Sequence, residues 1–281
     1  MKRFTLISCL LALTLTGAGH TSCTGRSAAT PADTSCIKTL KDHGIAMTWI
    51  QDNQKPKTMP ASLFPEAARA VIDSLGMTES GFPATISTFL VQADGKNLLF
   101  DAGLGSPDSR LLPALQSLQL SPDDIQYIFL THFHGDHIGG LLTPSGEAVF
   151  KKAQVYASKA EYDGWMKMPK AQRAQVEQLR AAYGNRLHLF DYADALPENI
   201  KPMEAKGHTP GHTVYAIGRF LIVGDLMHGA ALQMPHPEFC ASYDQQPDQA
   251  VSTRRYFLDY VRSHHLIMAG MHLPAPAFWQ P

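Results

Sequence analysis

Apolar residues follow two different periods along the chain from residue 83 onward. Short apolar runs, several of them rich in β-branched residues, predict strands, whereas apolar positions three or four residues apart predict helices. Residues 93–96, Ala-Asp-Gly-Lys, predict a hairpin turn between the first two strands. Strands are predicted over residues 86–92, 97–100, 125–130, 153–157, 214–217, 220–223 and 266–269, and helices over residues 111–118, 170–183 and 248–261. This mixture predicts an α/β (α+β) layered domain.

The first 29 residues have a different pattern from the rest. Lys2 and Arg3 precede an apolar run over residues 4–15, and small and polar residues follow, as is typical of a signal peptide. The run is shorter than the roughly 20 residues that a membrane-spanning helix needs. We therefore expect residues 1–29 to be a signal peptide with a flexible tail. Residues 30–281 are expected to form a single exported domain, periplasmic or extracellular, with no membrane span.

The four cysteines leave two alternatives open. A lipid anchor is disfavoured, because Cys9 has too few apolar residues before it and Cys23 lacks an apolar residue three positions earlier. Cys36 and Cys240 remain in the exported chain, where a disulfide between them and two unpaired thiols are equally consistent with the sequence. No pair has Cys-x-x-Cys spacing, which excludes a thiolate metal site or a redox motif of that kind.

The charge of the chain bears on its partners. With 24 Lys and Arg against 25 Asp and Glu, the formal charge is −1. Nucleic-acid binding depends on clustered basic residues, so we expect a small-molecule substrate and no nucleic acid, and the sequence gives no oligomeric state. The chain also has 13 histidines. Histidine is the commonest metal ligand, so the positions of these side chains are the next question.

The densest group of histidines lies in residues 131–140, Thr-His-Phe-His-Gly-Asp-His-Ile-Gly-Gly, directly after a predicted strand. Alternate residues at the end of an extended segment point to the same side, so His132 and His134 are expected to converge on one ion. Gly135 lets the backbone turn, and Asp136 and His137 are therefore expected to face a second ion. The alternative is a solvated histidine-rich loop.

Three further segments offer ligands of the same types. Residues 206–213, Lys-Gly-His-Thr-Pro-Gly-His-Thr, form a predicted loop with two imidazoles. The strand over residues 220–223 leads into Gly224 and Asp225, and the strand over residues 266–269 leads through Gly270 to His272. Each segment taken alone fits a cap or a turn, but together with the first group they indicate a shared metal site.

These motifs, in this order, resemble the metallo-β-lactamase superfamily of binuclear metal hydrolases over residues 89–274. The resemblance implies the αββα sandwich of that family, with the metals at one edge of the two sheets. Carried over by position, it implies one metal held by His132, His134 and His212, a second held by Asp136, His137 and His272, and Asp225 as the bridge.

Three residues in or beside these motifs, Asp101, His208 and His228, lie outside the ligand set carried over above. Asp101 matches an aspartate that ends a strand in this family, which implies a carboxylate that orients a ligand histidine by hydrogen bonding; a turn-forming aspartate is the alternative. His208 and His228 do not match the ligand positions carried over above. They are expected either beside the site or on the surface.

The resemblance implies a metal-dependent hydrolase. In such a site two divalent ions share a bridging water and supply a hydroxide nucleophile without a protein base. Asp136 is expected to orient that hydroxide through its free carboxylate oxygen. Imidazole and carboxylate ligands suit zinc, with manganese, iron and cobalt as alternatives.

The expected substrate class follows from short stretches of sequence around the ligands. Residues 224–233 and 271–274 most resemble the methyl parathion hydrolase-like branch, which is linked to the cleavage of ester-type bonds in phosphotriesters and lactones. A class B3-like β-lactamase is one alternative, although such enzymes generally lack the bridging aspartate, here Asp225. A metal-binding protein without activity is another, and the complete ligand set argues against it. After residue 274 the chain departs from the branch, which affects one wall of the pocket.

Overall fold

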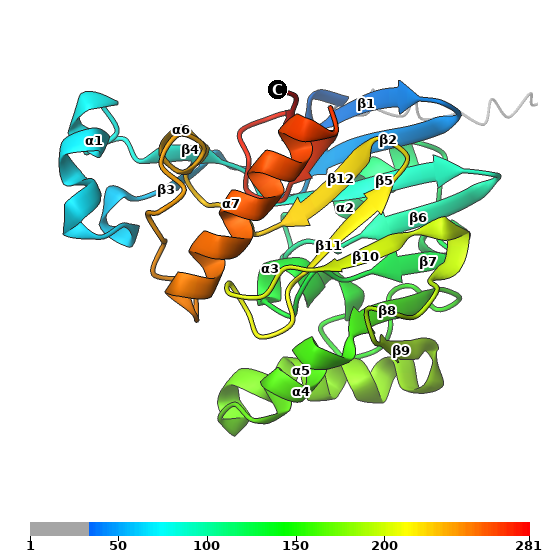
Figure 1. Ribbon diagram of the computed structural model, residues 1–281. Helices are drawn as coiled ribbons and strands as arrows, with labels where there is room; N and C mark the ends of the chain where they lie inside the picture. Colours follow the sequence, from blue (N-terminus) through cyan, green and yellow to red (C-terminus); the bar gives the residue numbers. More distant parts are fainter. Residues whose placement is uncertain (1–33) are drawn as a thin grey trace, which may run out of the picture. The chain divides into compact units, whose positions relative to one another are not determined.

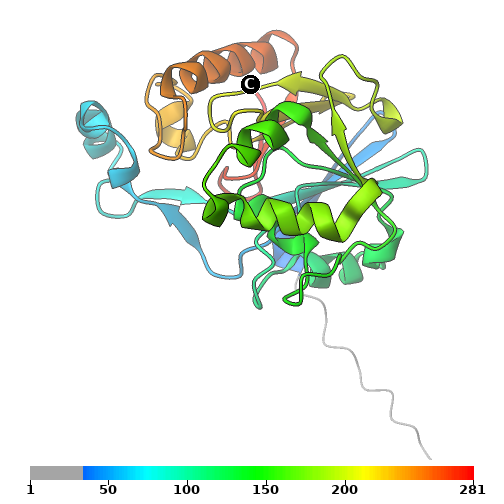
Figure 2. The ribbon, with the colours of Figure 1, turned by 90° about the horizontal axis from the view of Figure 1, so that it is seen from below.

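Two β-sheets lie face to face, and helices cover the outer face of each sheet (Figure 1). The computed structural model describes residues 34–281, so the signal peptide predicted over residues 1–29 lies outside the described residues. Figure 2 shows the same layers from below, with α4 and α5 in green on one side and α7 in orange on the other. The predicted α/β fold with an αββα arrangement is confirmed.

The larger sheet has seven strands, and its second half is parallel. From β6 to β9 neighbouring strands pair in parallel, whereas the pairs from β1 to β6 are antiparallel. The carboxyl ends of parallel strands meet at one edge, so the loops after β6, β7 and β8 come together there. In spatial order the strands are β1 (Ile37–Asp42), β2 (Ile45–Gln51), β5 (Ser87–Ala93), β6 (Lys96–Phe100), β7 (Tyr127–Phe129), β8 (Gln154–Ser158) and β9 (Leu187–Phe190).

The smaller sheet brings two more strand ends to the site. Its strands are β10 (Lys201–Glu204), β11 (Thr213–Ile217), β12 (Phe220–Gly224), β13 (Ile267–Gly270) and β14 (Phe278–Trp279), in that order. Helix α7 (Pro247–Ser263) connects β12 to β13, which pair in parallel. Asp225 follows β12 directly and His272 is the second residue after β13, and the two side chains therefore lie side by side.

Apolar side chains fill all three interfaces between the layers of the sandwich. Between the sheets, Phe100 and Phe129 from the larger sheet pack against Tyr215 from the smaller one. The other face of the larger sheet packs against α2 (Leu111–Ser117), α4 (Lys159–Met166) and α5 (Lys170–Tyr183). Helix α7 contributes Phe257 and Val261 to the core of the smaller sheet. Both faces of each sheet are thus buried, which explains why several strands are continuous apolar runs.

A separate small core lies beside the sandwich. The chain between β2 and β5 forms a two-stranded sheet, β3 (Lys57–Met59) and β4 (Phe82–Ala84), and helix α1 (Arg69–Ser74). Met59, Phe64 and Phe82 pack there against Leu232 of α6 (Ala230–Gln233). This segment carries Lys57 and Met59 to the rim of the site described below.

The predicted elements agree with the structure in type, with shifts at their ends. The hairpin of β5 and β6 is confirmed, and α5 covers the predicted residues. The pattern predicts no element before residue 83, yet β1 to β4 and α1 lie there; α4, β9, β10 and β14 were not predicted either. Several of these are three- or four-residue elements, which are too short for a clear period.

Two further features concern the cysteines and the membrane. No disulfide joins Cys36 to Cys240, because the Cys240 thiol is free and donates a hydrogen bond to the Pro247 carbonyl at 3.3 Å. No helix within residues 34–281 is long and apolar enough to cross a bilayer.

The aromatic layer between the sheets gives a stability prediction. Phe129 is fully buried, and its ring stacks on Phe100 at 5.3 Å and on Tyr156 at 5.4 Å between centroids. Phe129→Ala should lower the free energy of unfolding by about 3–5 kcal/mol in urea titrations, because it leaves a cavity. The exposed Tyr256→Ala is the control and should change it by about 0.5 kcal/mol at most. Equal effects of the two variants would contradict this description of the core.

Candidate metal centre

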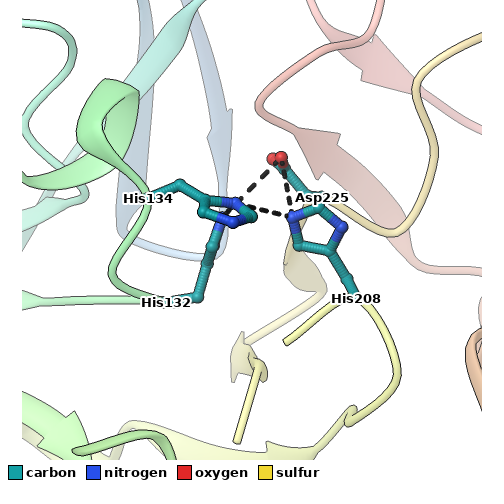
Figure 3. A group of neighbouring side chains, drawn as sticks. All are labelled: His132, His134, His208 and Asp225. Atoms are coloured by element: carbon teal, nitrogen blue, oxygen red, sulfur yellow. Dashed lines mark hydrogen bonds and ion pairs between the residues drawn. The ribbon is translucent and has the colours of Figure 1, made fainter. Parts of the chain in front are cut away.

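The predicted ligands gather at the edge where the strands of both sheets end. His132 follows β7 by three residues, and the short helix α3 (Gly135–Ile138) carries Asp136 and His137. Asp225 and His272 follow β12 and β13. The loop before β11 completes the site with His208, as seen in Figure 3. Residues far apart in the sequence thus converge because their strands end at a common edge.

One group consists of three imidazoles and a carboxylate that point toward one another (Figure 3). The His134 Nδ1 atom lies 2.9 Å from His132 Nε2 and 3.0 Å from His208 Nε2. The Oδ2 atom of Asp225 lies 3.4 Å from His208 Nε2 and 3.8 Å from His132 Nε2. These distances leave four donor atoms around one small volume.

A second group lies on the other side of the Asp225 carboxylate and contains Asp136, His137 and His272. His272 Nε2 is 3.0 Å from Asp225 Oδ2 and 3.4 Å from Asp136 Oδ2. His137 Nε2 is 3.1 Å from Asp225 Oδ1. Asp225 is therefore shared between the two groups, in the place where the family resemblance implied a bridging carboxylate.

The electrostatics of the site depend on burial and on its carboxylates. Burial lowers the pKa of His134 to about 3 and holds that of His132 well below its usual range. Burial also disfavours the charged form of His137, but the carboxylates of Asp225 and Asp101 outweigh it and raise the pKa of that imidazole well above its usual range. Burial would raise the pKa of Asp225, yet the imidazoles of His137 and His272 hold it well below its usual range. Asp225 is thus a buried carboxylate.

Two orphaned atoms indicate that the site fits cations. His137 Nε2 and Asp225 Oδ1 are buried and lie 3.1 Å apart as an ion pair, yet neither atom makes a well-directed hydrogen bond. Buried polar atoms in proteins are almost always paired, so such a pair of orphans needs an explanation. Neutral imidazole nitrogens and carboxylate oxygens are the donor types that bind zinc and similar ions. The residues present therefore fit divalent metal ions.

Comparison with known proteins agrees with this geometry. A family model described as the Metallo-beta-lactamase superfamily matches residues 81–261, more than half of the 281 residues. The chain belongs to the metallo-beta-lactamase superfamily. The predicted hydrolase is thereby confirmed, together with the superfamily that the motifs resemble.

Two solved structures match most of the chain, and one of them is described as a hydrolase in the beta-lactamase superfamily. The hydrolase AbOPH is 26% identical, with a TM-score of 0.77 over 87% of this chain and 92% of that chain. AidC, a dizinc quorum-quenching lactonase in complex with a product, is 25% identical, with a TM-score of 0.77 over 86% of this chain and 92% of that chain.

Curated relatives match over shorter segments. A hydroxyacylglutathione hydrolase of Xanthomonas euvesicatoria pv. vesicatoria is 28% identical over 138 residues, 49% of this chain and 44% of the relative. Ribonuclease Z of Nanoarchaeum equitans is 44% identical over 71 residues, 25% of this chain and 21% of the relative. The chain thus spans less than half the length of each of these relatives.

One residue carried over from the metallo-beta-lactamase pattern does not join the others. His212 was expected beside His132 and His134, but its Nε2 accepts a hydrogen bond from the Asp225 amide at 3.0 Å, and its Nδ1 lies 3.2 Å from the Ala205 carbonyl. Both ring nitrogens are therefore engaged by the backbone. His208 occupies the expected place instead. The Pro210–Gly211 turn reverses the chain between the two histidines, and nothing in the motif's spacing distinguishes them.

Hydrogen bonds behind the imidazoles fix their orientation. Asp101 accepts from His137 Nδ1 at 2.7 Å and from the Thr131 amide and hydroxyl at 2.8 and 2.7 Å, as expected for an orienting carboxylate. It does so with a φ of 56°, a backbone conformation unusual for a residue with a Cβ. The Thr85 carbonyl lies 2.7 Å from His272 Nδ1. Each contact leaves the Nε2 atom of its histidine directed into the site.

Asp244 orients the His208 imidazole in the same way. No pattern in the sequence predicts this role. Asp244 Oδ1 lies 3.1 Å from His208 Nδ1, and its Oδ2 accepts from Arg254 Nη2 at 2.8 Å. Arg254 is itself buried and also donates to the Leu226 carbonyl. Only the tertiary structure brings these residues together, because Asp244 lies 36 residues after His208.

A cavity of about 310 Å³ opens onto both groups of ligands. His228, which the sequence left between the site and the surface, is buried here, with Nε2 3.2 Å from Asp225 Oδ2. Tyr243 is half-exposed and packs its ring 5.2 Å from that imidazole. The remaining lining residues are Lys57, Met59, His134, Gly135, Asp136, His208, Asp225 and His272.

The contact behind His208 gives a testable prediction. Asp244→Asn should weaken binding of one metal ion about 10–100-fold, the usual effect of removing a carboxylate that orients a ligand histidine. Zinc affinity is measured by competition with a chromophoric chelator. The matched control is Asp248→Asn, an exposed aspartate at the start of α7, which should bind zinc like the parent protein. Unchanged affinity in Asp244→Asn would contradict the role given to this carboxylate.

Proposed function

We propose that this chain is a dinuclear metallo-hydrolase that opens lactones. The observation that carries the proposal is the position of Asp225, whose carboxylate lies within 3.0–3.4 Å of imidazoles from both groups. In this proposal one ion would be held by His132, His134 and His208, and the other by Asp136, His137 and His272. Asp225 would be a ligand to both.

We propose zinc as the metal. Imidazole and carboxylate ligands suit zinc, and in AidC, with 25% identity, the related site is described as dizinc. Manganese, iron and cobalt accept similar ligands and remain the alternatives. The imidazoles must be neutral to bind any of these ions, so metal binding displaces the protons that the neighbouring carboxylates favour on His137 and His272.

The two metal ions, when bound, supply a hydroxide nucleophile near neutral pH and polarise the oxygen of the scissile bond. The chain's own contribution begins with Asp136, whose side chain is 26% exposed and faces the cavity. Burial would raise its pKa, but His137 and His272 lower it, so the carboxylate is ionised. It is placed to orient the nucleophile and to carry a proton on a carboxylate oxygen toward the leaving group. Met59 and Tyr243 offer apolar surface to the rest of the substrate.

A lactone is the first candidate for the substrate, supported by the similarity to AidC over most of both chains. A phosphotriester is the second. Residues 224–233 and 271–274 resemble the methyl parathion hydrolase-like branch, and this local resemblance favours it. A class B3-like β-lactamase is disfavoured, because the bridging Asp225 is present.

We also propose that residues 1–29 direct export of the enzyme, as their sequence pattern indicates.

The choice between His208 and His212 is tested by metal content. His208→Ala should lose about one of two bound zinc ions, because it removes a direct donor. His212→Ala removes hydrogen bonds to the backbone and ring packing against His132 and His208, but no proposed metal donor. It should therefore retain more zinc than His208→Ala. Metal is measured by mass spectrometry after gel filtration. If His212→Ala lost more zinc than His208→Ala, His212 would be the ligand, as the family resemblance implied, and His208 would not.

The substrate class is tested with zinc-loaded protein and three substrates: a medium-chain N-acyl homoserine lactone, an aryl phosphotriester and a cephalosporin. The lactone should have the highest kcat/KM, a chelator should abolish turnover, and added zinc should restore it. Two bound zinc ions without turnover of any substrate would instead indicate a metal-binding protein without this activity. A preference for the cephalosporin would indicate a β-lactamase.

A further inference from the structure

Helix α4 lies against both loops that carry the first group of imidazoles. The Ser158 hydroxyl, at its start, accepts from the Glu161 amide at 3.1 Å and donates to the Gly211 carbonyl at 2.7 Å. At its other end the Trp165 ring packs edge-on to His134, with centroids 5.6 Å apart. The helix therefore touches the loop of His132 and His134 as well as the loop of His208.

Close backbone approach fixes the distance between α4 and the second loop. A Cβ on Gly211 would lie 2.0 Å from the Glu161 nitrogen, so only glycine fits at this position. A Cβ on Gly164 would lie 2.5 Å from the Cβ of Pro210. These two contacts leave no room for the loop to move toward the helix.

Glu161 joins the two loops through a single carboxylate. It is 1% exposed, and its Oε1 accepts from the Phe133 amide at 3.1 Å and from Trp165 Nε1 at 2.6 Å. Its Oε2 accepts from the Thr209 hydroxyl and the Gly211 amide, both at 2.8 Å. Phe133 lies between His132 and His134 in the sequence, and Thr209 directly follows His208. Each oxygen thus holds one ligand-bearing loop.

The chemistry of these contacts requires a carboxylate. All four partners of Glu161 donate, and none is a cation, so the buried charge is stabilised by neutral donors alone. A glutamine has nearly the same shape but only one accepting atom. If its NH₂ group replaced Oε1, it would face the N–H groups of Phe133 and Trp165. If the NH₂ group replaced Oε2, it would face the backbone N–H group of Gly211. Either arrangement leaves a backbone donor unpaired, which is costly in a buried site.

We propose that Glu161 is a positioning residue that sets the separation of His208 from His132 and His134, and thereby the affinity of this group for metal. The inference rests on the proposed function, since it assumes that these imidazoles bind an ion. Removing a residue that orients metal ligands typically weakens metal binding 10–100-fold.

The test compares Glu161→Gln with the parent protein and with Glu177→Gln, an exposed glutamate on α5. Zinc affinity is measured by chelator competition, the cobalt-substituted proteins are compared by their visible absorption spectra, and the melting temperature is recorded without metal. Glu161→Gln should bind one equivalent of zinc 10–100-fold more weakly and show an altered cobalt spectrum. Glu177→Gln should match the parent protein in both.

A second variant covers the case in which Glu161→Gln does not fold. Thr209→Val keeps the shape of the side chain and the carboxylate but removes one donor to Oε2, and it should weaken binding of the same equivalent several-fold. The proposal is overturned if the variants only lower the melting temperature of the metal-free protein and leave zinc affinity and the cobalt spectrum unchanged. A parent protein that binds no metal would overturn the proposed function and this inference together. Absence of hydrolysis with intact metal binding would affect the proposed function alone.

Discussion

The burial of the Asp225 carboxylate among imidazoles is the constraint on which the rest of the site depends. Asp225, Asp101 and Asp136 lie at this edge, and within the described residues no lysine or arginine forms an ion pair with any of them. Uncompensated buried charge is expensive. His137 and His272, whose pKa values the carboxylates raise, supply part of the positive charge, whereas burial holds the pKa values of His132 and His134 down. Divalent ions held by these two groups of ligands would satisfy this requirement and would give the buried His137 Nε2 and Asp225 Oδ1 atoms a partner.

The αββα fold meets the constraint by ending several strands at one edge. Strands β6, β7 and β8 are parallel neighbours in one sheet, and β12 and β13 are parallel neighbours in the other. Their ends deliver Asp101, His132, Asp225 and His272 on rigid backbone. Of the other ligands, His134, Asp136 and His137 follow His132 closely in the chain, at or within helix α3. His208 comes from a separate loop. That loop is held by Asp244 on one side and by Glu161, through Thr209 and Gly211, on the other, so its position is fixed by contacts rather than by a strand.

The sequence predicts most of this site because its ligands lie close together in the chain or directly after clear strands. Residues 131–140 and the strand ends at Asp225 and His272 are examples. His208 and His212 could not be separated, because which imidazole points inward depends on the turn at Pro210 and on backbone contacts of β12. Asp244 and Glu161 were not found, because the ligand-bearing loops that they hold lie 28 to 50 residues away and only packing brings them together. Strand β2 escaped prediction because both of its faces are buried, so its sequence gives no alternation of apolar and polar residues.

Anomalous X-ray diffraction from crystals of the zinc-loaded protein, recorded on both sides of the zinc absorption edge, tests the central claim most directly. Two zinc peaks are expected, one on each side of the Asp225 carboxylate. One should be bound by the Nε2 atom of His208 with His132 and His134, and the other by Asp136, His137 and His272. A single peak, a peak bound by His212, or no peak at this edge of the sheets would contradict it.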